Sequence, residues 1–335
     1  MRGVPSIRQV VFAAIAMAAA SCLVAAIVVW RDPQAVVRAE YTRERIAAGL
    51  SQASVRIGDH RWVYAYSNDA PPGAPTLVLL HGFTGSKENW YPVARALRGR
   101  YRIVVPDLPG WGQSQRRPGA DYGFVAQAAR VSAFLRVVSP RAPVVLAGHS
   151  MGGGIVPLVA ARTPARVSRI GLVAAAGVRF RDNQFGKDVL AGQNPFGVDD
   201  AASLQRYLDI LFNARAAQPW VPWPVSRIVI ARRRHDARFE QSVLDRIGRG
   251  NERFAPGQAA RAVRQPALLL WCRQDRVIDA SAMDLYAAAM PQARKVLLEG
   301  CGHMAPMERP DAVAKAIDAL VAATASPQVR ASGGD

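Results

Sequence analysis

A long apolar run lies near the start of the chain. Residues 10 to 30 read VVFAAIAMAAASCLVAAIVVW and contain no charged side chain. A helix of these 21 residues would be about 31 Å long, which matches the hydrocarbon core of a bilayer. Arg8 and Arg31 lie on either side of the run, and Trp30 suits a membrane–water interface. The pattern predicts an N-terminal tail at 1–9 and a transmembrane helix at 10–30.

A cleaved signal peptide is the competing interpretation of this run. The small residues in AMAAAS would suit a cleavage site, but the run stays apolar well beyond Cys22. A lipoprotein site at Cys22 is less favoured, because Ala19 stands where a larger aliphatic residue is usual. Residues 31–54 are predicted to form a juxtamembrane helix and linker, with the helix between Pro33 and Gly49.

Beyond residue 54, short apolar runs alternate with stretches that suit helices. VRIGDHRWVYAYSN (55–68) predicts an antiparallel hairpin or pair of strands. Buried strands are predicted at 76–82, 101–108, 143–150, 169–177, 266–275 and 294–303. Helices are predicted at about 88–99, 123–138, 151–163, 281–290 and 310–323. This alternation predicts an α/β fold with a mostly parallel sheet and helices on both faces.

Residues 178–265 do not follow this alternation of strands and helices, because they contain no convincing buried strand. Leu204, Tyr207, Leu208 and Leu211 share one helical face, and PWVPWP predicts a rigid aromatic turn. We predict a helical cap inserted between two strands and lying over the carboxyl edge of the sheet. A second, unrelated domain is the less favoured alternative at this length. The other predicted boundaries are a core of 55–177 and 266–325 and a flexible tail at 326–335.

A serine follows one of the predicted strands directly. The segment GHSMG fits G-x-S-x-G, in which side chains at Gly148 and Gly152 would clash within a strained turn. Ligands of parallel sheets bind at the carboxyl ends of strands, which is where Ser150 is expected. The segment therefore predicts Ser150 as a nucleophile. An ordinary turn is the alternative, so the prediction requires partner residues.

One histidine lies where a general base would be needed. His303 follows the last predicted strand and should reach the same sheet edge as Ser150. Asp275, at the end of ALLLWCRQD, is predicted to orient His303, with Asp279 as the reserve candidate. In the alternative interpretation, Asp275 is a loop carboxylate that pairs with a neighbouring arginine. The other histidines are assigned structural or surface positions: His60, His81, His149 and His235.

Two backbone N–H groups are predicted to stabilise an oxyanion. One belongs to Met151, which follows the nucleophile, and the other to Phe83 in HGFTGS. Each such donor typically lowers the barrier by about 3 kcal/mol. His81 is expected to shape the Phe83 loop. A second glycine-rich turn, DLPGWGQS, is predicted to be scaffold, with Asp107 in a structural role.

Composition changes this picture little. The net charge is +18, and Arg accounts for 39 of the 43 basic residues because only four are Lys. Codon bias is the favoured reading, followed by contact with an anionic membrane surface. Nucleic acid is disfavoured, since no basic run carries interleaved aromatics. The densest cluster, ARRRH (231–235), is predicted to be a solvated helix face.

The three cysteines form neither a disulfide framework nor metal-ligand spacing. Cys272 and Cys301 each lie near a residue predicted to be catalytic, so the two could be close together. A bond between them is the less favoured interpretation, because the sequence does not define the geometry.

With HGFTGS, DLPGWGQS, GHSMGG, the Asp275 loop and GCGHMAPMERP in this order, the chain resembles the α/β-hydrolase superfamily over about residues 55–325. Together with the apolar N-terminus, it resembles bacterial membrane-anchored lipases and phospholipases A. The resemblance implies an eight-stranded sheet and hydrolysis of lipid or other acyl esters through an acyl-enzyme, without cofactor or metal. It also implies a bacterial inner-membrane anchor, a periplasmic catalytic domain and a homodimer formed through the anchor.

The arginines around the apolar run predict the opposite sidedness. Two arginines precede the run and four follow it within residues 31–45, which would place the C-terminal bulk in the cytoplasm. We follow the resemblance on this point. The juxtamembrane helix offers another role for those arginines.

Several other activities share this scaffold. A small-ester esterase, a carbon–carbon bond hydrolase, an iminopeptidase and an acyltransferase would use the same residues. Ser150 argues against haloalkane dehalogenases and epoxide hydrolases, which resemble this fold but carry Asp at that position. A non-catalytic binding protein is disfavoured by the intact set of Ser150, Asp275 and His303.

Overall fold

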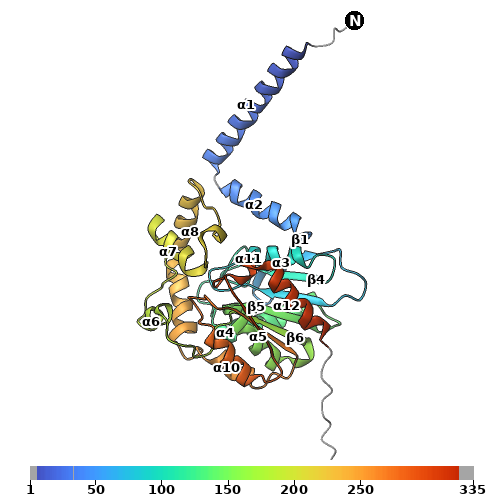
Figure 1. Cartoon of the computed structure of the whole chain (residues 1–335), viewed down its shortest axis with the longest axis vertical. Helices are drawn as coiled ribbons and strands as arrows, with labels where there is room; N and C mark the ends of the chain where they lie inside the picture. Colours follow the sequence, from blue (N-terminus) through green and yellow to red (C-terminus); the bar gives the residue numbers. More distant parts are fainter. Residues whose placement is uncertain (1–5, 33, 324–335) are drawn as a thin grey trace, which may run out of the picture.

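A computed structural model describes residues 6–32 and 34–323 (Figure 1). The side chains at 22, 24–26 and 28–30 lie outside the described part, as does the predicted tail at 326–335. The strands are β1 (Leu50–Ile57), β2 (His60–Ser67), β3 (Thr76–Leu80), β4 (Arg102–Pro106), β5 (Val144–His149), β6 (Val167–Val173), β7 (Ala267–Cys272) and β8 (Arg294–Leu298).

The helices fall into three groups along the chain. Two precede the sheet: α1 (Ile7–Arg31) and α2 (Gln34–Ala47). Those associated with the core are η1 (Lys87–Trp90), α3 (Tyr91–Ala96), α4 (Phe124–Val138), α5 (Met151–Arg162), η2 (Pro164–Arg166), α10 (Ser281–Ala289), α11 (Ala305–Glu308) and α12 (Pro310–Ala322). Those between β6 and β7 are α6 (Gln184–Leu190), α7 (Ala201–Leu211), η3 (Arg215–Ala217), α8 (Val225–Leu244), the π-helical turn η4 (Asp245–Arg249) and α9 (Ala255–Ala260).

All eight strands of the described residues belong to one sheet, in the order β1-β2-β4-β3-β5-β6-β7-β8. The hairpin of β1 and β2 is antiparallel, β2 pairs antiparallel with β4, and the remaining neighbours pair in parallel. The predicted α/β architecture with a mostly parallel eight-stranded sheet is therefore confirmed.

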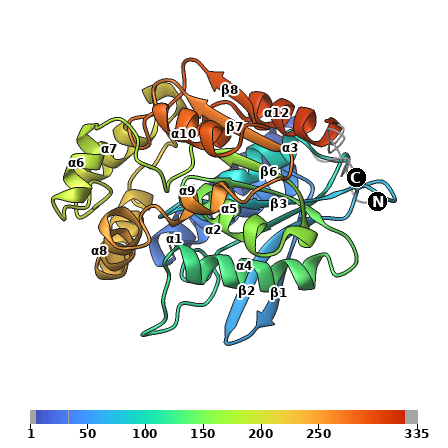
Figure 2. The same ribbon diagram turned by 90° about the horizontal axis from the view of Figure 1, so that it is seen from below.

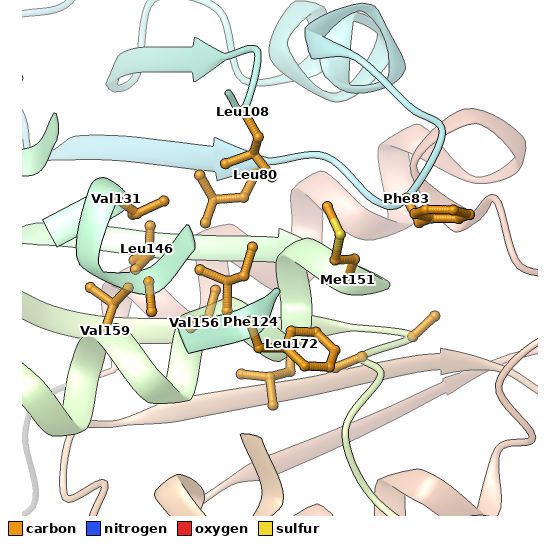
Figure 3. Packing of buried hydrophobic residues seen from close by; sticks show 14 of the residues in the cluster. Leu80, Phe83, Leu108, Phe124, Val131, Leu146, Met151, Val156, Val159 and Leu172 are labelled. Carbon is orange, nitrogen blue, oxygen red and sulfur yellow. The ribbon is translucent and has the colours of Figure 1, made fainter. Parts of the chain in front are cut away.

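The parallel strands are buried on both faces, because successive side chains point to opposite sides. Val78 and Leu80 of β3 join one apolar cluster with α4, α5, α9 and α10, which includes the packing shown in Figure 3. Leu77 and Leu79 join the other cluster, with α3 and α12. This two-sided packing holds the carboxyl ends of the strands, and the loops that follow them, in fixed positions.

Residues 178–265, hereafter the helical insertion, lie mostly to one side of the sheet. Figures 1 and 2 both show α6, α7 and α8 gathered there, while α9 packs on α5. Arg233, in the ARRRH cluster, is only 9% exposed. The predicted solvated face was therefore wrong at this position, because α8 turns Arg233 toward α7 and Glu240.

Among the described residues, no helix is both long enough and apolar enough to cross a membrane. The predicted transmembrane segment at 10–30 falls within α1, and part of it lies outside the described side chains.

Candidate active site

Ser150 lies in a sharp turn between β5 and α5. Its φ of 54° is left-handed, a strained conformation for a residue with a side chain. A Cβ at Gly148 would approach the carbonyl oxygen of Gly152 to 2.3 Å, and one at Gly152 would approach the carbonyl oxygen of His81 to 2.5 Å. The predicted need for glycine on either side is therefore confirmed, and the turn presents Ser150 at the carboxyl edge of the sheet.

Asp275 and His303 are in direct contact, although 28 residues separate them. Nδ1 of His303 lies 2.8 Å from Oδ2 of Asp275, and the two residues are only 2% and 6% exposed. The other oxygen of Asp275 accepts the backbone N–H groups of Val277 and Ile278 at 2.8 and 3.0 Å. With Nδ1–H donating to this carboxylate, Nε2 of His303 is free to accept a proton.

The alternative partners of Asp275 are engaged elsewhere. Arg273 pairs with Glu299, and the guanidinium of Arg276 donates to the carbonyl of Asp209. The reserve candidate Asp279 accepts the backbone N–H of Ser281 at the start of α10. Asp275 is therefore the carboxylate that contacts His303.

His149, the last residue of β5, links the turn that carries Ser150 to the loop that carries His303. His149 donates from Nε2 to the carbonyl of His303 at 2.8 Å, and the two imidazole rings are 4.7 Å apart. Burial lowers the pKa of His149, which keeps it neutral. Within the described residues, the Ser150 hydroxyl makes no hydrogen bond to His303, and such bonds often tighten only when substrate is bound. The sequence indicated only a structural role for His149, without this contact.

The predicted oxyanion donors lie on both sides of the nucleophile turn. Phe83 belongs to the loop after β3, and Met151 begins α5. A Cβ at Gly82 would lie 2.9 Å from Cβ of Ser150, so the Phe83 loop packs directly on the turn. In the described chain, neither the N–H of Phe83 nor that of Met151 donates to another protein group. Both remain available as donors, and their role in catalysis stays a prediction.

His81 joins this loop to the loop after β4. Its Nδ1 donates to the carbonyl of Gly82 at 2.8 Å, and its Nε2 accepts the N–H of Leu108 at 2.9 Å. Complete burial lowers the pKa of His81 to about 4. Asp107 accepts the ammonium of Lys87 at 2.9 Å and two backbone N–H groups. Both residues therefore have the structural roles predicted for them.

Cys272 and Cys301 form a disulfide, so the less favoured interpretation is the correct one. The pairing of β7 with β8 sets Cys272 opposite Leu298, which brings the end of β7 close to the loop after β8. The Cα atoms are 5.4 Å apart, within the usual range. The bond joins the end of β7, just before the loop that carries Asp275, to the loop that carries His303.

A narrow cavity of about 90 Å³ opens beside Ser150. Phe83 and Met151 line it from the core, and the two charged residues in its lining are Asp182 and Arg253. Most of the remaining lining comes from apolar side chains of the helical insertion, among them Phe185, Val189, Phe196, Leu244 and Ile247. Such a site suits an apolar group attached to the atom that Ser150 attacks. Within the described residues, no cluster of His, Cys, Asp or Glu could hold a metal ion.

Residues 75–310 match a family model described as the alpha/beta hydrolase fold. The chain belongs to the α/β-hydrolase family. Among solved structures, this α/β-hydrolase is similar to a bacterial membrane phospholipase A, with 32% identity and a TM-score of 0.81 over 94% of this chain and 98% of the other. The resemblance predicted from the motifs is thereby confirmed.

Two curated relatives are also similar over most of their lengths. Human (Homo sapiens) monoacylglycerol lipase ABHD6 is 28% identical over 88% of each chain. Lipase 1 of Psychrobacter immobilis is 28% identical over 82% of this α/β-hydrolase and 84% of that protein. Together with the fold, these relatives identify the chain as an ester hydrolase.

Proposed function

We propose that this α/β-hydrolase is a membrane-anchored serine hydrolase that cleaves the acyl esters of lipids. The observation that carries the proposal is the buried Asp275–His303 contact at the sheet edge where the strained turn presents Ser150. A buried carboxylate that is fixed by two backbone N–H groups suits an imidazole that becomes charged during a reaction.

In the proposed reaction, His303 takes the proton of Ser150 as the hydroxyl attacks the ester carbonyl. Asp275 holds the imidazole in the required tautomer and stabilises its cation. The N–H groups of Phe83 and Met151 stabilise the oxyanion. His303 then protonates the leaving alcohol. In the second half of the reaction His303 takes a proton from water as the water attacks the acyl-enzyme, and it returns this proton to Ser150 as the acid is released.

The substrate class is inferred from the cavity and from the names of the relatives. The apolar lining beside Ser150 suits an acyl chain. The relatives are named as a monoacylglycerol lipase, a lipase and a phospholipase A. A small-ester esterase, a carbon–carbon bond hydrolase, an iminopeptidase and an acyltransferase are the other outcomes that a substrate panel would distinguish.

The first test combines active-site labelling with that panel. A fluorophosphonate probe should label the full-length protein, and Ser150→Ala should abolish labelling. Ser242→Ala is the matched control, since Ser242 is an exposed serine on α8. Esters of increasing chain length, monoacylglycerols and phospholipids would then be compared. Labelling that survives Ser150→Ala would contradict the mechanism, and hydrolysis of only short soluble esters would contradict the lipid substrate.

We also propose that residues 10–30 anchor the protein in a bacterial inner membrane, with the catalytic part in the periplasm. The Cys272–Cys301 disulfide supports this side, because disulfides persist in oxidising compartments. Trp220 and Trp223 are 88% and 66% exposed, as suits side chains at a membrane interface. Their neighbour Pro224 lines the same cleft as the first residue of α2, which follows α1.

The sidedness and the anchor can be tested together. A C-terminal reporter that is active only in the periplasm should be active, and the protein should resist extraction from membranes by high salt. A reporter active only in the cytoplasm would contradict the placement. We further propose a homodimer formed through the anchor. Cross-linking in native membranes should trap a dimer, and replacing residues 10–30 with an unrelated apolar segment should abolish it.

A further inference from the structure

One hydrogen bond joins the Phe83 loop to the helical insertion. Oγ1 of Thr84 lies 3.0 Å from the hydroxyl of Tyr207 on α7, across 123 residues of sequence. Thr84 has a φ of 59°, a left-handed conformation that is strained for a β-branched residue. Strained backbone persists where its surroundings hold it in place. The contact with Tyr207 is such a restraint.

The position of Thr84 matters because it follows Phe83 directly. On the other side of Phe83, Gly82 packs against Ser150 so closely that no side chain would fit. The ring of Phe83 lies 6.3 Å from that of Trp111 and 5.9 Å from that of Phe196. The loop is therefore held by the nucleophile turn at one end and by the helical insertion at the other.

Tyr207 is itself held by a buried ion pair. The guanidinium carbon of Arg233 lies 4.8 Å from the centre of the Tyr207 ring. Arg233 pairs with Glu240 at 3.0 Å and donates to the carbonyl of Phe196 at 2.6 Å. Because Phe196 also contacts the ring of Phe83, Arg233 supports both contacts between the insertion and the loop.

We infer that Tyr207 is a positioning residue for the oxyanion site: its hydroxyl holds Thr84 so that the N–H of Phe83 can reach the oxyanion formed at Ser150. The inference rests on the proposed function and extends it to the helical insertion. Tyr207 acts through Thr84 and does not touch the reacting atoms. Stabilisation of the transition state therefore depends on the place of α7 beside the loop.

The test removes one hydroxyl at a time. In the full-length protein, Tyr207→Phe should lower kcat for a short soluble ester about 3- to 10-fold and leave KM within about twofold. A lower kcat with an almost unchanged KM is expected because the oxyanion donor stabilises the transition state more than the bound substrate. Thr84→Val should have the same effect, and the double variant should show no further loss. Thr84→Ser keeps the hydroxyl and should retain activity.

Tyr66→Phe is the matched control, because Tyr66 lies on β2, away from the Phe83 loop. The rate of Ser150 labelling by a fluorophosphonate should fall in the same ratio as kcat, since the phosphonyl oxygen needs the same donors. An active wild type with unchanged kcat in Tyr207→Phe would overturn the inference alone. The inference would also be overturned if Tyr207→Phe lost activity only because its melting temperature fell, or only because its KM rose while kcat stayed unchanged. A wild type that is neither labelled nor active would overturn the proposed function as well.

Discussion

The sheet edge and the helical insertion both reach Ser150, but they do so with different interactions. At the sheet edge, His303 and Asp275 are buried, 2.8 Å apart and further fixed by backbone N–H groups. The insertion contributes apolar side chains such as Phe185 and Leu244 to the cavity. Its polar contact with the Phe83 loop, Tyr207 to Thr84, is a hydrogen bond between two hydroxyl groups.

The difference follows from what each region must hold. A proton transfer depends on angles and on distances near 3 Å, which directional hydrogen bonds between rigid strand ends can fix. An apolar group needs only a volume of suitable shape, because the hydrophobic effect has no direction. Substitutions at the sheet edge should therefore change rates by orders of magnitude, whereas those in the insertion should change them several-fold.

The largest effect is expected at the base. His303→Ala should lower kcat for a short soluble ester roughly 10⁴-fold or more, because no other group would accept the serine proton. Steady-state kinetics measure the loss, and thermal unfolding checks that the fold is retained. A decrease in kcat of less than about tenfold would show that His303 is not the general base. It would also contradict the expected difference between the sheet edge and the insertion.

The disulfide should contribute to the rigidity of the sheet edge. The double variant Cys272→Ser, Cys301→Ser should lower the free energy of unfolding by about 3 kcal/mol, because the bond closes a loop between residues 29 apart. Urea unfolding measures this change. A reducing agent should lower the stability of the wild type to the same extent and leave the double variant unaffected. Equal stability of both proteins would show that the strands alone hold these loops.

Acid should lower the stability of the protein through the buried histidines of the sheet edge. Burial lowers the pKa of His81 to about 4, below the value of 6.5 that is usual for an exposed histidine. Protons therefore bind the unfolded chain first as the pH falls below about 6.5, and stability decreases toward pH 4. From pH 7 to 4.5 the free energy of unfolding should fall by about 2 kcal/mol from this group. The pKa of His149 is lowered too, which acts in the same direction.

Urea unfolding at several pH values measures this dependence. His81→Gln should make this dependence shallower, because one of the two buried histidines that cause it is gone. His235→Gln should retain it, since His235 is exposed on α8. A flat profile in the wild type would contradict the assignment of a neutral, buried His81.

The smallest effect is expected in the cavity. Phe185→Ala should lower kcat/KM for a medium-chain ester about threefold to tenfold and leave that for an acetyl ester within about twofold, because only the longer chain reaches the lost surface. Leu285→Ala is the control, an exposed residue on α10 that does not line the cavity. An equal loss for both esters would mean that Phe185 supports the catalytic geometry instead.

Much of the sheet edge could be predicted, because its signals are local. GHSMG predicts a strained turn, and the apolar runs before Asp275 and His303 predict strands whose carboxyl ends share one edge. The structure brings Asp275 and His303 together there. The Cys272–Cys301 bond has no such local signal, because it depends on β8 being the neighbour of β7 in the sheet.

The insertion was harder to predict. The ARRRH cluster has the composition of a solvated face, yet Arg233 is buried between Tyr207 and Glu240. Tyr207 could be assigned to an apolar helix face from its spacing. Its hydrogen bond to Thr84 had no signal in the sequence, since the two residues belong to separate segments whose spacing follows no period.

The sequence by itself determined the order of strands and helices, the strained serine turn and the residue types that a proton relay needs. These are properties of short stretches, governed by side-chain periodicity and by the few conformations open to glycine-flanked turns. Only the tertiary structure decided which distant groups meet: Cys272 with Cys301, His149 with the carbonyl of His303, and Thr84 with Tyr207. Such contacts depend on strand order and on how helices pack over the sheet, and both are set by the burial of the whole core.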